Sequence, residues 1–234
     1  RAKTSMIEIK NLNYIYQQGM PGEKQALKDI SLTIQTGDFA ALIGHTGTGK
    51  STHIQHLNAL IKPTSGEIII DGIPICDPKT DLKAIRRMVG LVFQYPEYQL
   101  FEETVYRDIA FGPTNMQLSE EEIRERVYEA AELVGLPEKL LEESPFELSG
   151  GQKRRAAIAG VLSMRPRVLI LDEPTAGLDP RGRDQLLNQL MTLHEKNPDM
   201  TVLLVSHSME DVARVAEHVF VLEHGRVTLS GTVP

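Results

Sequence analysis

The chain has 234 residues, 41% hydrophobic and 24% charged, which suits one large α/β domain or two small ones. A formal net charge of −7 argues against nucleic acid as the main partner, because surfaces that bind DNA or RNA are basic. The single cysteine, Cys76, excludes an internal disulfide framework and favours a reducing compartment. We expect a cytosolic chain, because no run approaches the roughly 20 apolar residues of a membrane span and no signal-peptide core follows the first residues.

The first third of the chain is predicted to form a small antiparallel sheet. Residues 6–10 alternate apolar and polar side chains, as an edge strand does, and residues 26–34 form a second strand. Residues 67–75 are predicted to be a hairpin, because their central Asp-Gly pair favours a tight turn. Tyr16, in the first loop, is placed to stack on a nucleobase, and the same pattern also fits an aromatic packed on a strand.

A glycine-rich loop lies between an apolar strand at residues 39–43 and a predicted helix at residues 51–57. It has the Gly-x4-Gly-Lys-Ser pattern of the phosphate-binding P-loop. Its glycines let backbone N–H groups converge on phosphate oxygens, next to the positive end of the helix. Lys50 is expected to reach the β and γ phosphates, and Ser51 to ligate Mg²⁺. The predicted nucleotide-binding residues of this loop are Gly44, His45, Thr46, Gly47, Thr48, Gly49, Lys50, Ser51 and Thr52.

A buried strand is predicted at residues 168–171, and it ends at two carboxylates. Sheets of α/β proteins bind ligands at the carboxyl ends of their strands. Asp172 is expected to hold Mg²⁺ through water, and Glu173 to orient or deprotonate the attacking water. Two more polar residues end strands: Gln94 is expected to ligate Mg²⁺ or hold a water, and His207 to lie near the γ-phosphate.

The middle of the chain is predicted to be mainly helical, which indicates a helical subdomain set into the α/β core. Ser119 and Glu122 form a capping-box pattern at the start of a helix that runs to about Val134. The basic residues 153–155 are interpreted as a solvated or salt-bridged helix face rather than an RNA site.

A second anion site is predicted at the sequence Leu-Ser-Gly-Gly-Gln, residues 148–152. Ser149 can cap the helix that follows, and Gly150 and Gly151 leave its first amides open to an anion. Gln152 completes the motif, so one chain carries two phosphate-binding segments.

The order of these motifs, with Leu178-Asp179 and Ser206-His207, resembles the ATP-binding subunits of ABC transporters over residues 6–231. The resemblance implies one α/β P-loop NTPase domain, residues 1–234, with a RecA-like core, an N-terminal antiparallel β subdomain and a helical signature subdomain. The core would span about residues 1–86 and 165–234, and the helical subdomain about 87–164. The resemblance also implies that ATP and Mg²⁺ are cofactors and that Asp179 belongs to the nucleotide site. It implies catalytic roles for Glu173, His207 and Gln94.

Within this class, residues 93–101 and 104–113 look like the ATPases of energy-coupling factor importers. Residues 156–160 and 176–182 are similar to the second of the two ATPase types in such complexes, which serve cobalt and vitamin uptake. That family usually carries a further C-terminal segment that helps to pair the ATPases. In that family a short helix follows the glutamine that corresponds to Gln94, and this helix contacts the membrane coupling protein. The matching residues here are Pro96, Glu97, Gln99 and Leu100.

The resemblance therefore implies an ATP hydrolase on the cytoplasmic side of the cell membrane that powers uptake of vitamins or transition-metal ions. ATP would close a head-to-tail dimer, with a second copy or a related ATPase, and hydrolysis would reopen it. Ser149 and Gly151 of one subunit would complete the γ-phosphate site of the other, and a separate membrane subunit would bind the transported substrate. The alternatives are an ATPase of an ordinary ABC importer, a soluble ABC ATPase and a regulatory ATP sensor.

Overall fold

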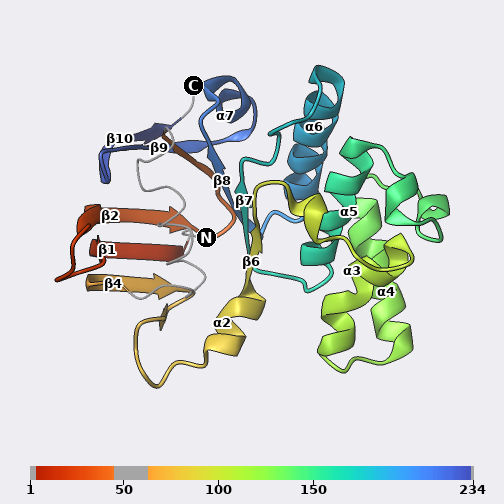
Figure 1. Ribbon diagram of the computed structural model, residues 1–234, viewed down its shortest axis with the longest axis horizontal. Helices are drawn as coiled ribbons and strands as arrows, with labels where there is room; N and C mark the ends of the chain where they lie inside the picture. The colour runs from red at the N-terminus through yellow and green to blue at the C-terminus, as the bar shows by residue number, and fades with distance from the viewer. Residues whose placement is uncertain (1–3, 45–62, 233–234) are drawn as a thin grey trace.

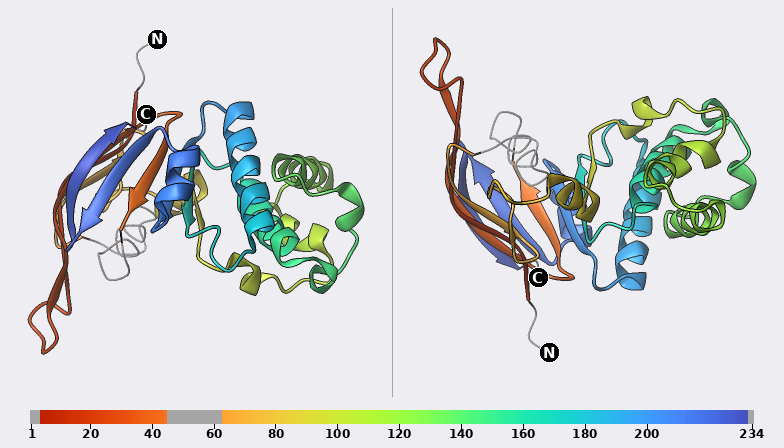
Figure 2. Two further views of the ribbon diagram at one scale, coloured as in Figure 1. Left: turned by 90° about the horizontal axis from the view of Figure 1, so that it is seen from above. Right: turned by 90° about the horizontal axis from the view of Figure 1, so that it is seen from below.

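The apolar residues of the strands belong to two sheets that pack against each other (Figure 2). The computed structural model describes residues 4–44 and 63–232. The four-stranded sheet is entirely antiparallel. In spatial order its strands are β2 (Lys24–Gln35), β1 (Ser5–Tyr16), β4 (Ser65–Ile70) and β5 (Ile73–Pro74).

Strand β1 lies inside this sheet, because it pairs with β2 on one side and with β4 on the other. The strand predicted at residues 6–10 is confirmed, but its position at an edge was wrong. An internal strand of an antiparallel sheet alternates in the same way when only one of its faces is buried. The hairpin predicted at residues 67–75 is confirmed, and its turn has Asp71 at φ 51° and Gly72 at φ 76°, the left-handed values of a type I′ turn.

The six-stranded sheet contains the strands predicted to be buried. Its spatial order is β10 (Arg226–Thr232), β9 (His218–Glu223), β3 (Phe39–Ile43), β8 (Thr201–Ser206), β7 (Val168–Asp172) and β6 (Val89–Val92). The strands from β9 to β6 are parallel, and β10 runs antiparallel to β9. Every residue of β3 and β8 is buried, as expected for parallel strands that are covered on both faces.

Alternate residues of the central strands face two different cores. In β3, Ala40 and Leu42 pack with the apolar face of the antiparallel sheet. Phe39, Ala41 and Ile43 pack with residues of the helices. The six-stranded sheet is therefore the middle one of three layers, with the antiparallel sheet on one side and most of the helices on the other (Figure 1).

The helices are α2 (Leu82–Met88), α3 (Val105–Asn115), α4 (Glu120–Leu133), α5 (Gly150–Leu162), α6 (Pro180–Lys196) and α7 (Met209–Val215), with short 3-10 helices η1 (Pro96–Gln99), η2 (Glu138–Leu140) and η3 (Pro145–Glu147). Helices α3, α4 and α5 contact one another, and α5 also contacts α6 and β6. The predicted start of α4 is confirmed, because the Ser119 hydroxyl accepts the Glu122 N–H. In the described ranges, each helix is too short or too polar to cross a membrane.

The strand predicted at residues 88–93 is confirmed but shorter, since Met88 ends α2 and the strand begins at Val89. This strand, β6, pairs with β7 in the six-stranded sheet. The boundary expected at about residue 87 consequently falls inside α2, and the helical layer begins only after Val92. The physical reason is that the apolar side chains of β6 are needed within the sheet, where Val89 and Val92 are buried. The wider division into a core and a helical subdomain stays a prediction.

Two glycines of the antiparallel sheet differ in what surrounds them. Gly66 and Gly72 both have left-handed φ values, 99° and 76°. A methyl group on Gly66 would overlap the backbone of Asn11 and Leu12 in β1, whereas one on Gly72 would meet no atom within 4 Å.

We expect Gly72→Ala to lower the free energy of unfolding by about 1 kcal/mol, the cost of a left-handed residue with a side chain. Gly66→Ala should cost about 2 kcal/mol more, because the strands must also move apart. Urea denaturation of the two variants measures both values. Equal losses in the two variants would contradict the close approach of β4 to β1.

Candidate active site

The four strands that precede the predicted catalytic motifs are neighbours in the sheet, in the order β3-β8-β7-β6, and they are parallel. Ile43 of β3 pairs with Ser206 of β8, and Asp172 of β7 pairs with Val205. The residues that follow these strands therefore leave the sheet at one edge, at its carboxyl end, where α/β proteins bind ligands. Gly44, His207, Glu173 and Gln94 all lie at this edge.

Glu173 and His207 are in direct contact at this edge. The Nδ1 atom of His207 lies 2.9 Å from Oε1 of Glu173. Glu173 is only 9% exposed, and its N–H donates to the carbonyl of Val205 at 2.8 Å. Its backbone is left-handed, with φ 47°, which turns the chain away from the direction of β7. Such a conformation costs about 1–2 kcal/mol for a residue with a side chain and is typical of functional sites. The carboxylate is thus fixed at its backbone and at its tip.

The predicted cap of α5 is confirmed. The Ser149 hydroxyl accepts the Gln152 N–H at 3.2 Å, and the Gln152 side chain accepts the Ser149 N–H at 3.0 Å. These two bonds satisfy one backbone donor each. Added methyl groups on Gly150 and Gly151 would meet no atom within 4 Å, so open space surrounds both glycines. An anion or a partner chain can therefore approach the first amides of this helix.

Two other predicted nucleotide residues lie apart from the catalytic edge in the contacts that the structure describes. Asp179 caps α6, and its Oδ1 accepts the Gly182 N–H at 2.7 Å. Tyr16 ends β1 and is 53% exposed, whereas Tyr14 is the tyrosine that packs on the core between the sheets. The alternative interpretation, in which Tyr16 packs against the core as part of a strand, therefore does not fit its exposure. The nucleotide contacts of Asp179 and Tyr16 stay predictions.

The oxygen donors proposed for Mg²⁺ lie on adjacent strands. Asp172 is the last residue of β7, and Gln94 follows β6, which pairs with β7. Carboxylate and amide oxygens are ligands that suit Mg²⁺, which also keeps several waters and substrate phosphate oxygens. The predicted P-loop residues beyond Gly44 lie outside the described residues: His45, Thr46, Gly47, Thr48, Gly49, Lys50, Ser51 and Thr52.

Comparison with known proteins decides the family. Residues 27–176 match the family model described as ABC transporter. The chain is 59% identical over 226 residues to the energy-coupling factor transporter ATP-binding protein EcfA2 of Caldanaerobacter subterraneus subsp. tengcongensis, covering 97% of this chain and 79% of that protein. It is 60% identical to EcfA2 of Clostridium tetani, covering 96% and 78%. The chain belongs to the energy-coupling factor ATP-binding proteins of the ABC transporter family.

Solved structures agree with this assignment. The cbiO1 protein of Clostridium perfringens, part of the ABC transporter complex cbiONQ, superposes with a TM-score of 0.90 at 42% identity, covering 98% of this chain and 89% of that one. An ATP-binding cassette solved as a dimer in a post-hydrolysis state with ADP and Pi has a TM-score of 0.83 at 32% identity, covering 98% and 99%. The predicted ABC ATPase fold and the predicted class of enzyme, an ATPase coupled to transport, are confirmed.

Arg154, on α5, is a buried charged residue whose contacts the sequence did not reveal, and this energy-coupling factor ATPase exposes only 2% of it. Its guanidinium donates to both carboxylate oxygens of Glu97, at 2.6 and 3.0 Å. It also donates to the carbonyl of Pro174 at 3.0 Å and to that of Ala176. Residues 153–155 were interpreted as a solvated or salt-bridged helix face, and Arg154 forms a salt bridge. Its spacing to Ile158, another buried residue one turn along α5, is the signal that places it on the core-facing stripe.

The segment that resembles the membrane-contact helix is the 3-10 helix η1, so a short helix here is confirmed. Pro96 is buried, Glu97 is bound to Arg154, and Leu100 packs on the helical core. Gln99 is exposed, as is Tyr98 at 82%. The exposed side chains of η1 are thus those of Tyr98 and Gln99, whereas Glu97 faces Arg154. A groove of about 440 Å³ borders η1. The residues that line this groove include Arg86, Arg87, Phe93, Gln99, Phe101 and Phe111.

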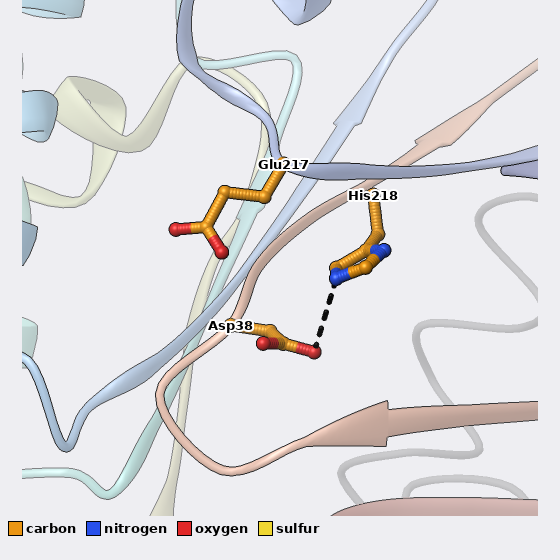
Figure 3. A group of neighbouring side chains, drawn as sticks. All are labelled: Asp38, Glu217 and His218. Atoms are coloured by element: carbon orange, nitrogen blue, oxygen red, sulfur yellow. Dashed lines mark ion pairs between the residues drawn. The ribbon is translucent and has the colours of Figure 1, made fainter. Parts of the chain in front are cut away.

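Another set of possible metal ligands lies at the opposite end of the sheet (Figure 3). Asp38 directly precedes β3, and Glu217 and His218 lie at the start of β9. Asp38 accepts the Gln35 N–H at 3.2 Å, and its Oδ2 lies 3.7 Å from Nε2 of His218. One ligand atom from each of Asp38, Glu217 and His218 lies within 4.8 Å of the other two, and Figure 3 draws an ion pair only between Asp38 and His218. We assign these residues a structural role, in which Asp38 ties the start of β3 to β9.

The ion pair between Arg154 and Glu97 makes stability depend on pH. Burial alone would raise the pKa of Glu97, but the hydrogen bonds and the positive charge of Arg154 outweigh it and hold the pKa below its ordinary value of 4.5. A carboxyl group with a lowered folded-state pKa stabilises the fold above its unfolded-state pKa. This stabilisation is lost as the pH falls through the folded-state pKa.

We expect Glu97→Gln to lower the free energy of unfolding by about 2 kcal/mol at pH 7, because a charged hydrogen bond to a buried guanidinium is lost. The difference from the unmodified chain should shrink below pH 4.5, as Glu97 becomes protonated. Chemical denaturation between pH 3 and 8 measures it.

The matched control is Glu103→Gln. Glu103 pairs with Arg107 at 3.1 Å, but both side chains are exposed, so its removal should cost at most about 0.5 kcal/mol. Equal losses of unfolding free energy in the two variants would contradict a stabilising ion pair between Arg154 and Glu97. So would a loss in Glu97→Gln that does not change with pH.

Proposed function

We propose that this chain is the ATP-hydrolysing subunit of an energy-coupling factor importer for vitamins or transition-metal ions, on the cytoplasmic side of the cell membrane. The observation that carries the proposal is the Glu173–His207 pair at the edge where the P-loop strand also ends. Identities of 59% and 60% to EcfA2 proteins favour this system over an ordinary ABC importer or a soluble ABC ATPase.

In this proposal Glu173 is the general base. Its carboxylate accepts a proton from water while the water oxygen attacks the γ-phosphorus and the bond to the β–γ bridging oxygen breaks, leaving ADP and phosphate. His207 holds the carboxylate through Nδ1 at 2.9 Å. Mg²⁺, when bound, neutralises charge on the phosphate oxygens. Ser51 would ligate the ion, Asp172 would hold it through water, and Gln94 would either ligate it or hold a water.

The site is proposed to be completed by a second subunit. The open space at Gly150 and Gly151 allows phosphate oxygens of a nucleotide bound to another subunit to reach the start of α5. Ser149 would contribute its hydroxyl to the same phosphate. ATP then favours the closed dimer because it binds both subunits there, and hydrolysis removes that preference. The solved dimeric cassettes with TM-scores of 0.83 support this arrangement.

The groove beside η1 is proposed to receive the membrane coupling protein. Large exposed aromatic residues beside a concave surface are typical of binding sites. Tyr98 stacks on Tyr95 with ring centroids 5.7 Å apart, and Phe101 meets Phe111 edge to face at 5.3 Å. These contacts hold the rings in place before a partner arrives. Transport would also require a separate membrane subunit that binds the cargo.

We expect Glu173→Gln to bind ATP but to hydrolyse it at least about a hundredfold more slowly, because the general base is lost. The variant should accumulate as a dimer with ATP. Phosphate release and size-exclusion chromatography with and without ATP measure these effects. Glu217→Gln, at the opposite end of the sheet, is the control. Normal phosphate release by Glu173→Gln would exclude Glu173 as the base.

We expect Tyr98→Ala to weaken binding to the membrane coupling protein by about tenfold or more, as the loss of an interface aromatic does. Affinity purification of the complex from membranes, with quantitation of the coupling protein, measures this. Met20→Ala is the matched control, since Met20 is an exposed apolar residue in the loop between β1 and β2. Unchanged recovery of the complex would show that η1 is not the docking site.

A further inference from the structure

A buried carboxylate, that of Asp211, follows His207 by four residues in the chain. Asp211, on α7, is 2% exposed. The Thr175 hydroxyl donates to its Oδ2 at 2.6 Å, and Arg183 Nε donates to its Oδ1 at 2.5 Å. A second guanidinium nitrogen of Arg183 also contacts Oδ1. The carboxylate therefore binds two side chains from a region of the chain outside α7.

Thr175 lies within the loop that carries Glu173, and Arg183 lies in the helix that follows this loop. The loop leaves β7 at Asp172 and reaches α6 at Asp179, its N-cap. Thr175 is two residues after Glu173, and Arg183 is in the first turn of α6, where its N–H donates to the Asp179 carbonyl at 2.9 Å. Asp211 thus joins the start of the loop to the helix that follows its end.

The segment that carries Asp211 also carries His207. His207 follows β8, and Ser208 caps α7 by accepting the Asp211 N–H at 3.3 Å. The loops after β7 and β8 are consequently bridged twice. One bridge, His207 to Glu173, has a largely exposed imidazole, and the other, Asp211 to Thr175, has a buried carboxylate. The backbone of this loop is also held by the Glu173 N–H bond to Val205 and by Arg154. The two side-chain bridges add to these contacts and restrict the direction of the Glu173 side chain.

We propose that Asp211, acting through Thr175 and Arg183, is a positioning residue for ATP hydrolysis that holds Glu173 in its catalytic orientation. This inference rests on the role proposed for Glu173. Burying a carboxylate is costly unless it is paired, and an apolar residue could pack α7 against the sheet without that cost. The directional bonds to Thr175 in the loop and to Arg183 in α6 are what an apolar residue could not provide.

The same two helices supply a matched control. Arg214 of α7 donates to Asp184 at 2.7 Å and to Asn188 at 2.8 Å, both on α6. This contact joins α7 to α6 without touching the loop from Glu173 to Asp179. Helices α6 and α7 lie next to each other, as Figure 2 shows. Loss of the Arg214 contact therefore tests whether α6–α7 packing alone matters.

The test compares Thr175→Val, Thr175→Ser, Asp211→Asn and Arg214→Gln in the full chain assembled with its partner subunits. Steady-state phosphate release gives kcat and KM, and thermal melting identifies variants that are not folded at the assay temperature. Thr175→Val keeps the shape of threonine and removes only the hydroxyl. We expect it to lower kcat about tenfold to a hundredfold with KM within about twofold, because misplacing a reacting group affects the chemical step.

Thr175→Ser keeps the hydroxyl and should restore kcat to within about twofold of the unmodified chain, as should Arg214→Gln. Thr175→Val and Asp211→Asn both weaken the bond between these two residues, so the double variant should lose less kcat than the product of the two single losses. Normal kcat in Thr175→Val, alongside inactive Glu173→Gln, would overturn this inference and leave the proposed function standing. Equal losses in Thr175→Val and Arg214→Gln would overturn it in favour of helix packing. An unmodified complex without ATPase activity would overturn the proposed function itself.

Discussion

The burial of four neighbouring parallel strands, β3, β8, β7 and β6, on both faces is the constraint on which the rest of the structure depends. A buried parallel sheet must pair every backbone group in its ladders, so its strands align in register and end together. That alignment brings the residues after β3, β8, β7 and β6 to one edge, although they are far apart in sequence. The antiparallel sheet and the helices supply the two apolar surfaces that make this burial possible.

The strands and the catalytic edge could be predicted from the sequence, because short apolar runs that end in polar residues are local signals. Glu173 and His207 were found in this way, and their contact was not, because it depends on the register between β7 and β8. The edge position of β1 was wrong because alternation reports burial of one face and not the number of neighbours. Arg154 and Asp211 were missed because their partners lie 20 to 57 residues away in the sequence.

Two buried charged residues on different helices hold the loop after β7. Arg154 reaches it from the helical layer through the carbonyls of Pro174 and Ala176, and Asp211 reaches it from α7 through Thr175. Arg154 also binds Glu97 in η1, so the surface segment proposed to meet a membrane protein is two contacts away from the catalytic loop. Both charges are paired, which is the condition under which such burial is tolerable.

The cap of α5 has a consequence for how a nucleotide can be recognised there. A hydroxyl group has one hydrogen to donate and two lone pairs to accept with. Ser149 uses its oxygen as the acceptor for the Gln152 N–H, which leaves the hydroxyl hydrogen for a phosphate oxygen. In the proposed dimer, the helix start would therefore keep its cap when the triphosphate of another subunit binds. The proposed association would therefore cost little in local rearrangement, because the start of α5 is already ordered in the single chain.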